Sequence, residues 1–153
     1  MAIFKKILLG LLGLLIILQF VPVDRSTPEE VDMNQDFLQI ESASQEVTTL
    51  LKSACYDCHS YQSHYPWYAY TAPTKWFIQN HIEEGRSHFN FNLWGSYKPG
   101  KKAHKAEESA EEVEEGHMPL PSYTWLHSEA KLDSEQIALL ENFFKEIERK
   151  YHN

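Results

Sequence analysis

A five-residue stretch, Cys55-Tyr56-Asp57-Cys58-His59, constrains this chain more than any other feature. It has the form C-x-x-C-H and uses both cysteines of the protein. Residues three apart share one face of a helical turn, so the sulfurs of Cys55 and Cys58 are expected to lie close together, with His59 beside them. The pattern therefore predicts a short helical turn that presents two thiols and an imidazole to the same space.

The C-x-x-C-H spacing is typical of covalent attachment of a c-type haem. Each thiol then forms a thioether with one vinyl-derived carbon of the haem, and the histidine that follows ligates the iron. We therefore expect Cys55 and Cys58 to hold one haem c covalently and His59 to be an axial ligand of its iron.

Three other interpretations of the motif stay open. A thioredoxin-like dithiol would sit near a strand-helix-strand pattern, and no convincing strand surrounds residue 55. A structural zinc site needs four ligands, and the motif supplies three crowded ones with no second cysteine pair elsewhere. A disulfide between Cys55 and Cys58 would close a very short loop and constrain little of the unfolded chain. Haem attachment is favoured over all three.

The N-terminus predicts export. Lys5 and Lys6 precede an apolar run that extends to residue 23, which is the order found in signal sequences, and the lysines would stay in the cytoplasm. Because no small-x-small cleavage site follows, an uncleaved membrane anchor over residues 1–23 is favoured over a removed signal peptide. Either alternative places the remaining chain on the periplasmic side of a bacterial inner membrane, where c-type haem is normally attached.

The exported part of the chain is acidic. Residues 26–153 contain 11 Lys and Arg against 21 Asp and Glu. This balance disfavours nucleic-acid binding, and an acidic face could attract a redox partner protein with a basic docking face. A soluble surface without such a role would have the same composition.

Hydrophobic periodicity predicts an all-α domain over residues 42–153, preceded by a linker over residues 24–41. Ser42 and Gln45 have the spacing of a capping box, so a helix is expected to begin there and to run into the C-x-x-C-H turn. Long aromatic loops are expected on both sides of a second helix over residues 73–84. Gly85 would end that helix, and its inner face would carry Trp76, Phe77 and His81.

The last two predicted helices have clear apolar faces. Residues 101–115 carry a narrow stripe and end at Gly116, and the final helix begins near Asp133 with Gln136 placed for a capping box. The stripe consists of Ala103, Ala106, Ala110 and Val113, and the face of the final helix consists of Ile137, Leu140, Phe143, Phe144 and Ile147.

This order of elements resembles that of a class I cytochrome c, in which a methionine on the loop before the C-terminal helix is the sixth iron ligand. Met1 is the initiator and Met33 lies in the predicted linker, which leaves Met118. We expect Met118 to ligate the iron, since Pro119 would stiffen its backbone and a thioether raises the reduction potential.

The far side of the iron has alternatives. His117 shares the loop with Met118, and His81 could face inward from its helix. An open or water-bound position is the third alternative. Arg86 could pair with a haem propionate or lie exposed on the surface. The four tryptophans could line a haem pocket or fill the core, and they are Trp67, Trp76, Trp94 and Trp125.

The region from Cys55 to Leu132 resembles a bacterial family described as a haem-binding domain with a C-x-x-C-H motif. The resemblance implies covalent haem binding and assigns no firm role to His81, Gly85 or Asn90. It rests on Cys55-x-x-Cys58-His59-Ser60, Pro66-Trp67-Tyr68, Pro73-x-x-Trp76, His81-x-x-x-Gly85-Arg86-x-x-x-Asn90-Phe91-Asn92-x-Trp94 and Met118-Pro119.

Together these features predict a membrane-tethered monohaem c-type cytochrome that transfers single electrons and is not an enzyme. The first alternative is a haem-based sensor or gas-binding domain in which Met118 is displaceable or does not ligate the iron. A dihaem peroxidase needs two attachment motifs, and the chain has one. A non-haem zinc or interaction module is the remaining alternative.

Overall fold

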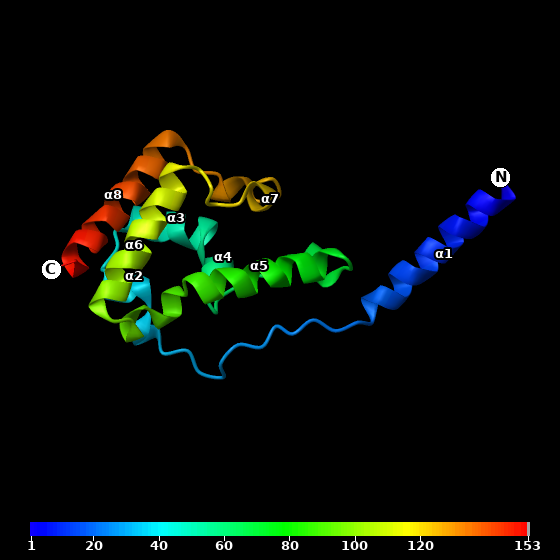
Figure 1. Ribbon diagram of the computed structural model, residues 1–153, viewed down its shortest axis with the longest axis horizontal. Coiled ribbons are helices and arrows are strands. Elements are labelled where there is room, and N and C mark those ends of the chain that lie inside the picture. Colours follow the sequence, from blue (N-terminus) through cyan, green and yellow to red (C-terminus); the bar gives the residue numbers. More distant parts are fainter. Residues whose placement is uncertain (153) are drawn as a thin grey trace.

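The computed structural model describes residues 1–152, and these form helices joined by loops with no strand among them (Figure 1). The predicted all-α fold with an N-terminal helix is thus confirmed. The α-helices are α1 (Ala2–Gln19), α2 (Phe37–Ile40), α3 (Gln45–Ala54), α4 (Tyr56–His59), α5 (Thr74–His88), α6 (Pro99–Glu114), α7 (Pro121–Thr124) and α8 (Ser134–Tyr151). The 3₁₀ helices are η1 (Met33–Gln35), η2 (Trp67–Tyr70), η3 (Phe91–Ser96) and η4 (Ser128–Ala130).

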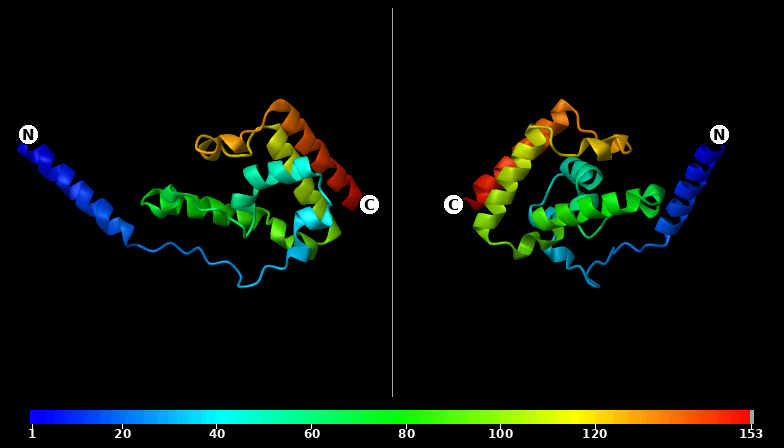
Figure 2. Two further views of the ribbon diagram at one scale, coloured as in Figure 1. Left: turned by 180° about the vertical axis from the view of Figure 1, so that it is seen from behind. Right: turned by 45° about the vertical axis from the view of Figure 1, so that its right-hand side comes forward.

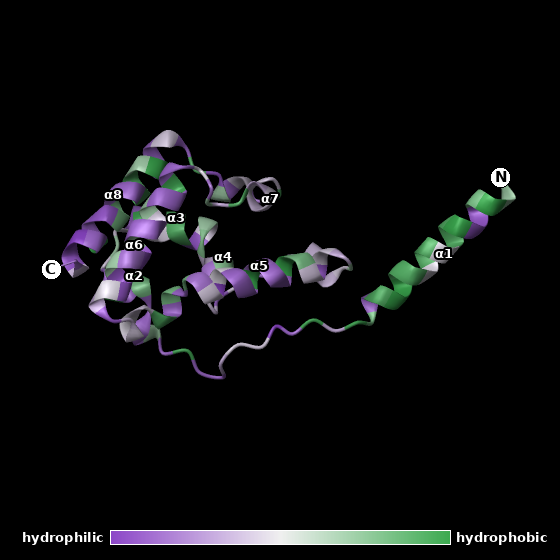
Figure 3. Cartoon of the chain, in the orientation of Figure 1, coloured by the Kyte–Doolittle hydropathy of each residue, from purple (hydrophilic) through white to green (hydrophobic). Residues whose placement is uncertain are grey.

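Helix α1 stands away from the packed domain and is apolar along most of its length (Figure 3). It has 18 residues, a mean hydropathy of 2.1 and no buried side chain. A helix of this length and composition can cross a membrane, and a signal sequence would have the same features. The helix therefore agrees with the predicted anchor and with the predicted signal peptide.

Helices α6 and α8 run antiparallel on the side of the domain opposite to α1, as the views from both sides show (Figure 2). The predicted stripe of α6 is buried against α8, where Leu140, Phe144 and Ile147 are also buried. Asp133 and Gln136 form the predicted capping box. Gly116 ends α6 with a φ of +72°, a conformation that glycine adopts without steric cost. The alanines of α6 permit close approach of the two helices.

The core extends into the segment predicted to be a linker. Phe37 is fully buried and contacts the rings of Phe91, Trp94 and Phe144 at centroid distances of 5.1, 4.9 and 5.9 Å. Asp36 caps α2 and is also buried. The packed domain therefore begins before residue 42. One buried aromatic residue in an acidic segment produces no periodicity, which is why the pattern did not reveal it.

A buried carboxylate joins the C-terminus of α8 to this early segment. Glu41 accepts hydrogen bonds from Trp94 Nε1 at 2.6 Å, from Lys150 Nζ at 2.7 Å and from Tyr151 Oη at 2.8 Å. Burial by itself would raise the pKa of Glu41, but these three donors outweigh it and hold the pKa below its usual value. The ionised carboxylate thus ties three distant parts of the chain together.

The helices on either side of the motif differ from prediction at their ends. The N-cap of α3 is Ser44, which accepts from Val47 N at 3.2 Å, whereas Ser42 adopts a φ of +51° before the helix. The second predicted helix continues through Gly85 to His88. Its buried residues are Lys75, Gln79 and Ile82. The predicted inner face was wrong for Phe77, which is 56% exposed, whereas Trp76 and His81 are partly buried.

Candidate functional site

The C-x-x-C-H motif forms a turn of its own at the end of α3. Cys55 leaves helical geometry with φ −127° and ψ −41°, and α4 then starts at Tyr56. Both cysteines are free thiols. Burial raises the pKa of Cys55 to about 12 and that of Cys58 to about 11, whereas the thiolate of a reactive dithiol needs a lowered pKa. Their surroundings thus favour the protonated thiols over the thiolates.

A cavity of about 660 Å³ lies between α4, α5, α6 and the segment that follows α6. This volume is within the range of about 300–1,000 Å³ that small molecules and cofactors occupy in proteins. The cavity is lined by all four predicted site residues, namely Cys55, Cys58, His59 and Met118. Its apolar wall consists of Ala54, Phe89, Phe91, Val113, Pro119, Leu120 and Phe144. Residues 60 positions apart in the sequence thus line the same cavity.

The imidazole of His59 is oriented by the backbone of the loop that follows α5. Its Nδ1 lies 3.0 Å from the carbonyl oxygen of Phe89. Because a carbonyl can only accept, Nδ1 carries the proton and Nε2 keeps its lone pair. Burial also lowers the pKa of His59 below its ordinary value, which favours the neutral ring. A histidine that donates its second N–H to a carbonyl is the usual arrangement of a metal ligand.

Gly85 lets α5 pack directly on the backbone of α4. A Cβ atom at this position would lie 2.8 Å from the carbonyl oxygen of Cys58, which is closer than such atoms approach in proteins. The prediction that Gly85 ends its helix was wrong, because the glycine serves helix packing inside α5. The close contact brings the rest of α5, with His81 and His88, to the wall of the cavity.

Tyr56, inside the motif, is fixed from two sides. Its hydroxyl donates to the carboxylate of Asp36, at 3.0 and 3.2 Å from the two oxygens, and its ring stacks on Phe91 at 4.6 Å. Asn92 Nδ2 also donates to Asp36, at 2.8 Å. Burial raises the pKa of Asp36 despite these hydrogen bonds. The motif is therefore held by the segment before α3 and by η3, in addition to α5.

The opposite wall of the cavity is held mainly through the backbone. The N–H groups of His117 and Met118 both donate to the carbonyl oxygen of Glu112, at 3.0 Å each. Met118 is partly buried, and the peptide bond to Pro119 is cis. These contacts place the thioether of Met118 at the C-terminal end of α6.

The two histidines considered as alternatives to Met118 differ in their position relative to the cavity. His117 is 62% exposed, pairs with Glu112 and Glu115 and does not line the cavity. His81 does line it, and its Nδ1 donates to the carbonyl oxygen of Phe77 at 2.8 Å.

Sequence reasoning missed His88 as a residue of the cavity wall. The spacing of His81, Gly85 and His88 at i, i+4 and i+7 places them on one helix face and could have revealed it. That signal needed α5 to continue past Gly85, whereas the glycine was interpreted as its end.

Arg86 is engaged by partners inside the protein. Its Nε donates to the carbonyl oxygen of Ser60 at 2.8 Å, and its Nη2 donates to Ser63 Oγ at 3.0 Å. The guanidinium also lies over the ring of Tyr61, 5.2 Å from its centroid. Arg86 therefore fixes the loop after the motif, and it does not line the cavity.

The tryptophans do not form the cavity wall. Trp94 is fully buried in the core, whereas Trp67 is 79% exposed and Trp125 is 84% exposed. Trp76 is partly buried, and its ring lies 4.8 Å from Lys75 Nζ. Of the two predicted roles, core packing holds for Trp94.

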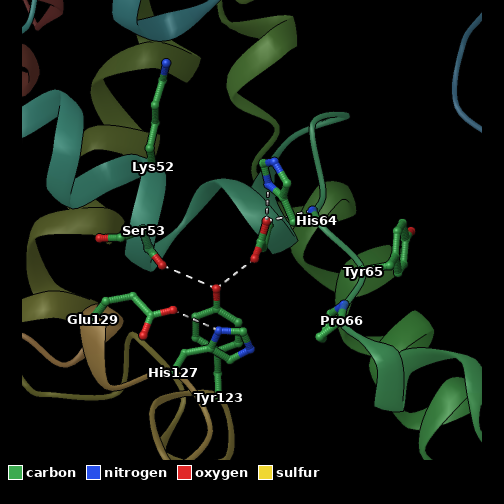
Figure 4. A pocket seen from close by; sticks show the side chains of 9 residues that line it. Lys52, Ser53, His64, Tyr65, Pro66, Tyr123, His127 and Glu129 are labelled. Carbon is green, nitrogen blue, oxygen red and sulfur yellow. Dashed lines mark hydrogen bonds and ion pairs between the residues drawn. The ribbon is translucent and has the colours of Figure 1, made fainter.

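A second, smaller cavity of about 330 Å³ lies next to the first (Figure 4). Tyr123 lines both cavities, and its hydroxyl donates to Asp57 Oδ2 at 2.8 Å. The other oxygen of Asp57 accepts from His64 N at 2.8 Å. Tyr123 thus links the segment that carries Met118 to the C-x-x-C-H turn and contributes to the walls of both cavities.

No group of three or more His, Cys, Asp and Glu side chains within residues 1–152 is arranged to hold a metal ion. The zinc interpretation therefore gains no support from the described part of the chain. The arrangement that does exist is the two thiols, the imidazole of His59 and the thioether of Met118 around a largely apolar cavity, with His81 and His88 also in its wall.

Residues 13–146 match the protein family described as a haem-binding domain. No curated protein and no solved structure gives a significant match.

Proposed function

Since the chain belongs to the haem-binding domain family, we propose that it is a monohaem c-type cytochrome that transfers single electrons on the periplasmic side of a bacterial inner membrane. A bound haem supplies the one-electron chemistry of its iron. The observation that carries the proposal is that Cys55, Cys58, His59 and Met118 line one cavity.

The residues of the motif have separate roles in this proposal. Cys55 and Cys58 would form the two thioethers, and both are partly buried free thiols at the cavity wall. His59 ligates the iron through Nε2, because Nδ1 is already engaged by the Phe89 carbonyl. The chain therefore holds the tautomer and the orientation that ligation needs before any haem is attached.

Met118 is proposed as the sixth ligand, from the opposite wall. A thioether ligand favours reduced iron, and the wall of the cavity is largely apolar. Among the lysines and arginines of residues 1–152, Lys105 alone lines the cavity. Its ammonium pairs with the carboxylate of Glu108. We assign to Lys105 the pairing with a haem propionate that the sequence suggested for Arg86.

Electron transfer also requires partners, and the acidic composition favours partner proteins with a basic docking face. The chain carries a formal net charge of −8. The rate of electron exchange with such a partner is expected to fall as salt is raised, because screening shortens the range of the attraction.

A redox titration of the purified holoprotein tests this function. The pyridine haemochrome spectrum should show a haem with two saturated vinyl positions, and the titration should follow a single one-electron Nernst curve. A spectrum of unmodified haem would contradict covalent attachment. A ferrous form that autoxidises at once, with no stable reduced state, would contradict the electron carrier.

The second candidate function is a haem-based sensor or gas-binding domain. The way in which Met118 is held favours this candidate. The hydrogen bond that joins Met118 to α6 in the described structure is made by its backbone N–H rather than by its thioether. A ferrous holoprotein that binds carbon monoxide rapidly would favour this candidate. Slow or absent binding would favour the saturated electron carrier.

A further inference from the structure

The end of the domain nearest to α1 carries exposed apolar side chains that neither the core nor the cavity uses. The N-terminal end of α5, with η2 before it, and the segment around α7 project toward the side on which α1 lies in all three views (Figures 1 and 2). Most of the strongly exposed large apolar residues after residue 23 are on these two projections. They are Trp67, Tyr70, Phe77, Trp125 and Leu126, and we call them the aromatic face.

The two projections form one unit. The hydroxyl of Tyr68, in η2, hydrogen-bonds His127 Nε2, just after the α7 segment. The ring of His127 stacks on Tyr123 of α7 at a centroid distance of 4.2 Å. Residues at the tips of both projections are therefore held in a fixed relation to each other.

Helix α1 ends at the same place. The ammonium of Lys75, at the start of α5, donates to the carbonyl oxygens of Leu18, Gln19 and Val21 at 3.0, 2.9 and 2.7 Å. Gln19 Oε1 accepts from Ala72 N at 3.0 Å. These bonds satisfy carbonyls that a helix C-terminus leaves without partners, and a cation is also favourable there. The C-terminus of α1 is thus fixed to the N-terminal end of α5, beside the aromatic face.

The linker reinforces this attachment. The guanidinium of Arg25 donates to the carbonyl oxygen of Ala69 and lies over the rings of Tyr70 and Tyr65, at 4.5 and 4.8 Å from their centroids. Arg25 and Lys75 are both engaged inside the protein, so the face offers tryptophan, tyrosine, phenylalanine and leucine rather than free basic side chains.

We propose that the aromatic face docks onto the lipid bilayer, with its tryptophan and tyrosine rings at the level of the headgroups. The proposal rests on the membrane tether of the proposed function. Tryptophan and tyrosine are enriched at membrane interfaces because one end of each ring system is apolar and the other is polar. A helix long enough to span the bilayer ends at this face, so the face meets the lipid whenever α1 is inserted.

Docking would also fix the orientation of the cavity. Two elements that carry the aromatic face, α5 and the segment through Tyr123, also form walls of the cavity. A domain held by α1 alone could rotate above the membrane, whereas a docked domain would keep the cavity at one height and tilt. Because the face lacks free basic residues, docking should occur on zwitterionic phosphatidylcholine and persist at high salt.

The test uses the full-length holoprotein in phosphatidylcholine vesicles, with a nitrobenzoxadiazole label on Trp67→Cys or Trp125→Cys. For each variant, the label's emission in vesicles with nitroxide lipids, which carry the nitroxide near the headgroup, is divided by its emission in vesicles without them. Energy transfer to the haem cancels in this ratio. The control is His104→Cys, on the far helix α6 with a side chain 61% exposed. Leu126→Cys replaces Trp125→Cys if that variant loses the wild-type haem spectrum.

The proposal predicts that nitroxide lipids lower the emission at both tips about twofold or more, while the His104→Cys label is unaffected, as expected for rings at the interface. Equal quenching at all three positions, or quenching at only one tip, would overturn it, and the free face would then be assigned to a protein partner. Reaction of the label with the wild-type protein would contradict covalent haem attachment but not the docking, because thioether formation blocks both native cysteines. Loss of the protein from floated vesicles would contradict the tether and the docking together.

Discussion

The two walls of the cavity are built in different ways. The wall with His59 is held by side chains and close helix packing, through the Phe89 carbonyl, the Gly85 contact and the Tyr56–Asp36 hydrogen bond. The wall with Met118 is attached to the C-terminal end of α6 by two backbone hydrogen bonds, and the hydroxyl of Tyr123 connects it to the motif.

The His59 wall is therefore the more firmly fixed part of the site. An imidazole that already has the required tautomer needs little reorganisation to bind iron, which is the advantage of a preorganised ligand. A thioether on a segment with few side-chain restraints can move away and return. We therefore expect changes on the His59 wall to prevent formation of the holoprotein, and changes on the Met118 wall to alter its properties.

The largest expected effect is that of His59→Ala. Without this imidazole a bound iron would lose the histidine ligand that the C-x-x-C-H motif supplies, so the yield of low-spin holoprotein should fall by about tenfold or more. Absorption spectra of the purified protein measure the effect. The matched control is His88→Ala, which removes another imidazole from the same cavity and should keep the wild-type spectrum. Equal losses in both variants would contradict the special role of His59.

Met118→Ala should keep the covalent haem but change its electronic properties. Loss of the thioether removes the methionine-to-iron charge-transfer band and lowers the reduction potential by an amount on the order of 0.1 V, because axial ligands are a main determinant of potential. The control is His117→Ala, whose imidazole lies outside the cavity. A spectrum that changes in the His117 variant and stays constant in the Met118 variant would reverse the ligand assignment.

Gly85→Ala tests the packing behind the His59 wall. Its new methyl group would press on the Cys58 carbonyl, so α5 must shift, and we expect the free energy of unfolding to fall by about 1–3 kcal/mol. Gly100→Ala is the control, because nothing lies within 4 Å of its added Cβ. That variant should be unchanged or slightly more stable. Chemical denaturation of both variants measures the difference, and equal stability would show that the α4–α5 contact is not tight.

The smallest expected effect is a pH dependence from Asp36. Its pKa is raised in the folded protein, mainly by burial, so its protonated form is favoured there. The associated stability is present below the ordinary pKa of aspartate and is lost as pH rises through the raised value. Asp36→Asn should flatten this part of the pH–stability curve. A curve with unchanged slope would show that Asp36 does not titrate with folding.

Much of the fold could be predicted because its signals are local. The capping box at Asp133 and the alanine stripe of α6 each depend on spacing within one helix, and both appear as predicted. The C-x-x-C-H turn is also local, so its placement followed from five residues. Met118 could be singled out because few methionines exist in the chain.

The missed features depend on contacts between distant segments. Gly85 was interpreted as a helix end, although its role is to admit the Cys58 carbonyl, a partner 27 positions away. Phe37 gave no signal, because a single aromatic residue shows its burial only when η3 and α8 surround it. Arg86 was assigned to a propionate or to the surface, while its actual partners, Ser60 and Ser63, lie on the loop after the motif.

Intact mass of the denatured protein, produced together with a cytochrome c maturation system, tests the central claim most directly. The account predicts a chain heavier by the mass of one haem, which acidic organic solvent does not remove, and a Cys55→Ala/Cys58→Ala double variant without this addition. The same spectrum shows whether α1 is still present. A wild-type chain with the mass of its amino acids alone would contradict covalent haem attachment.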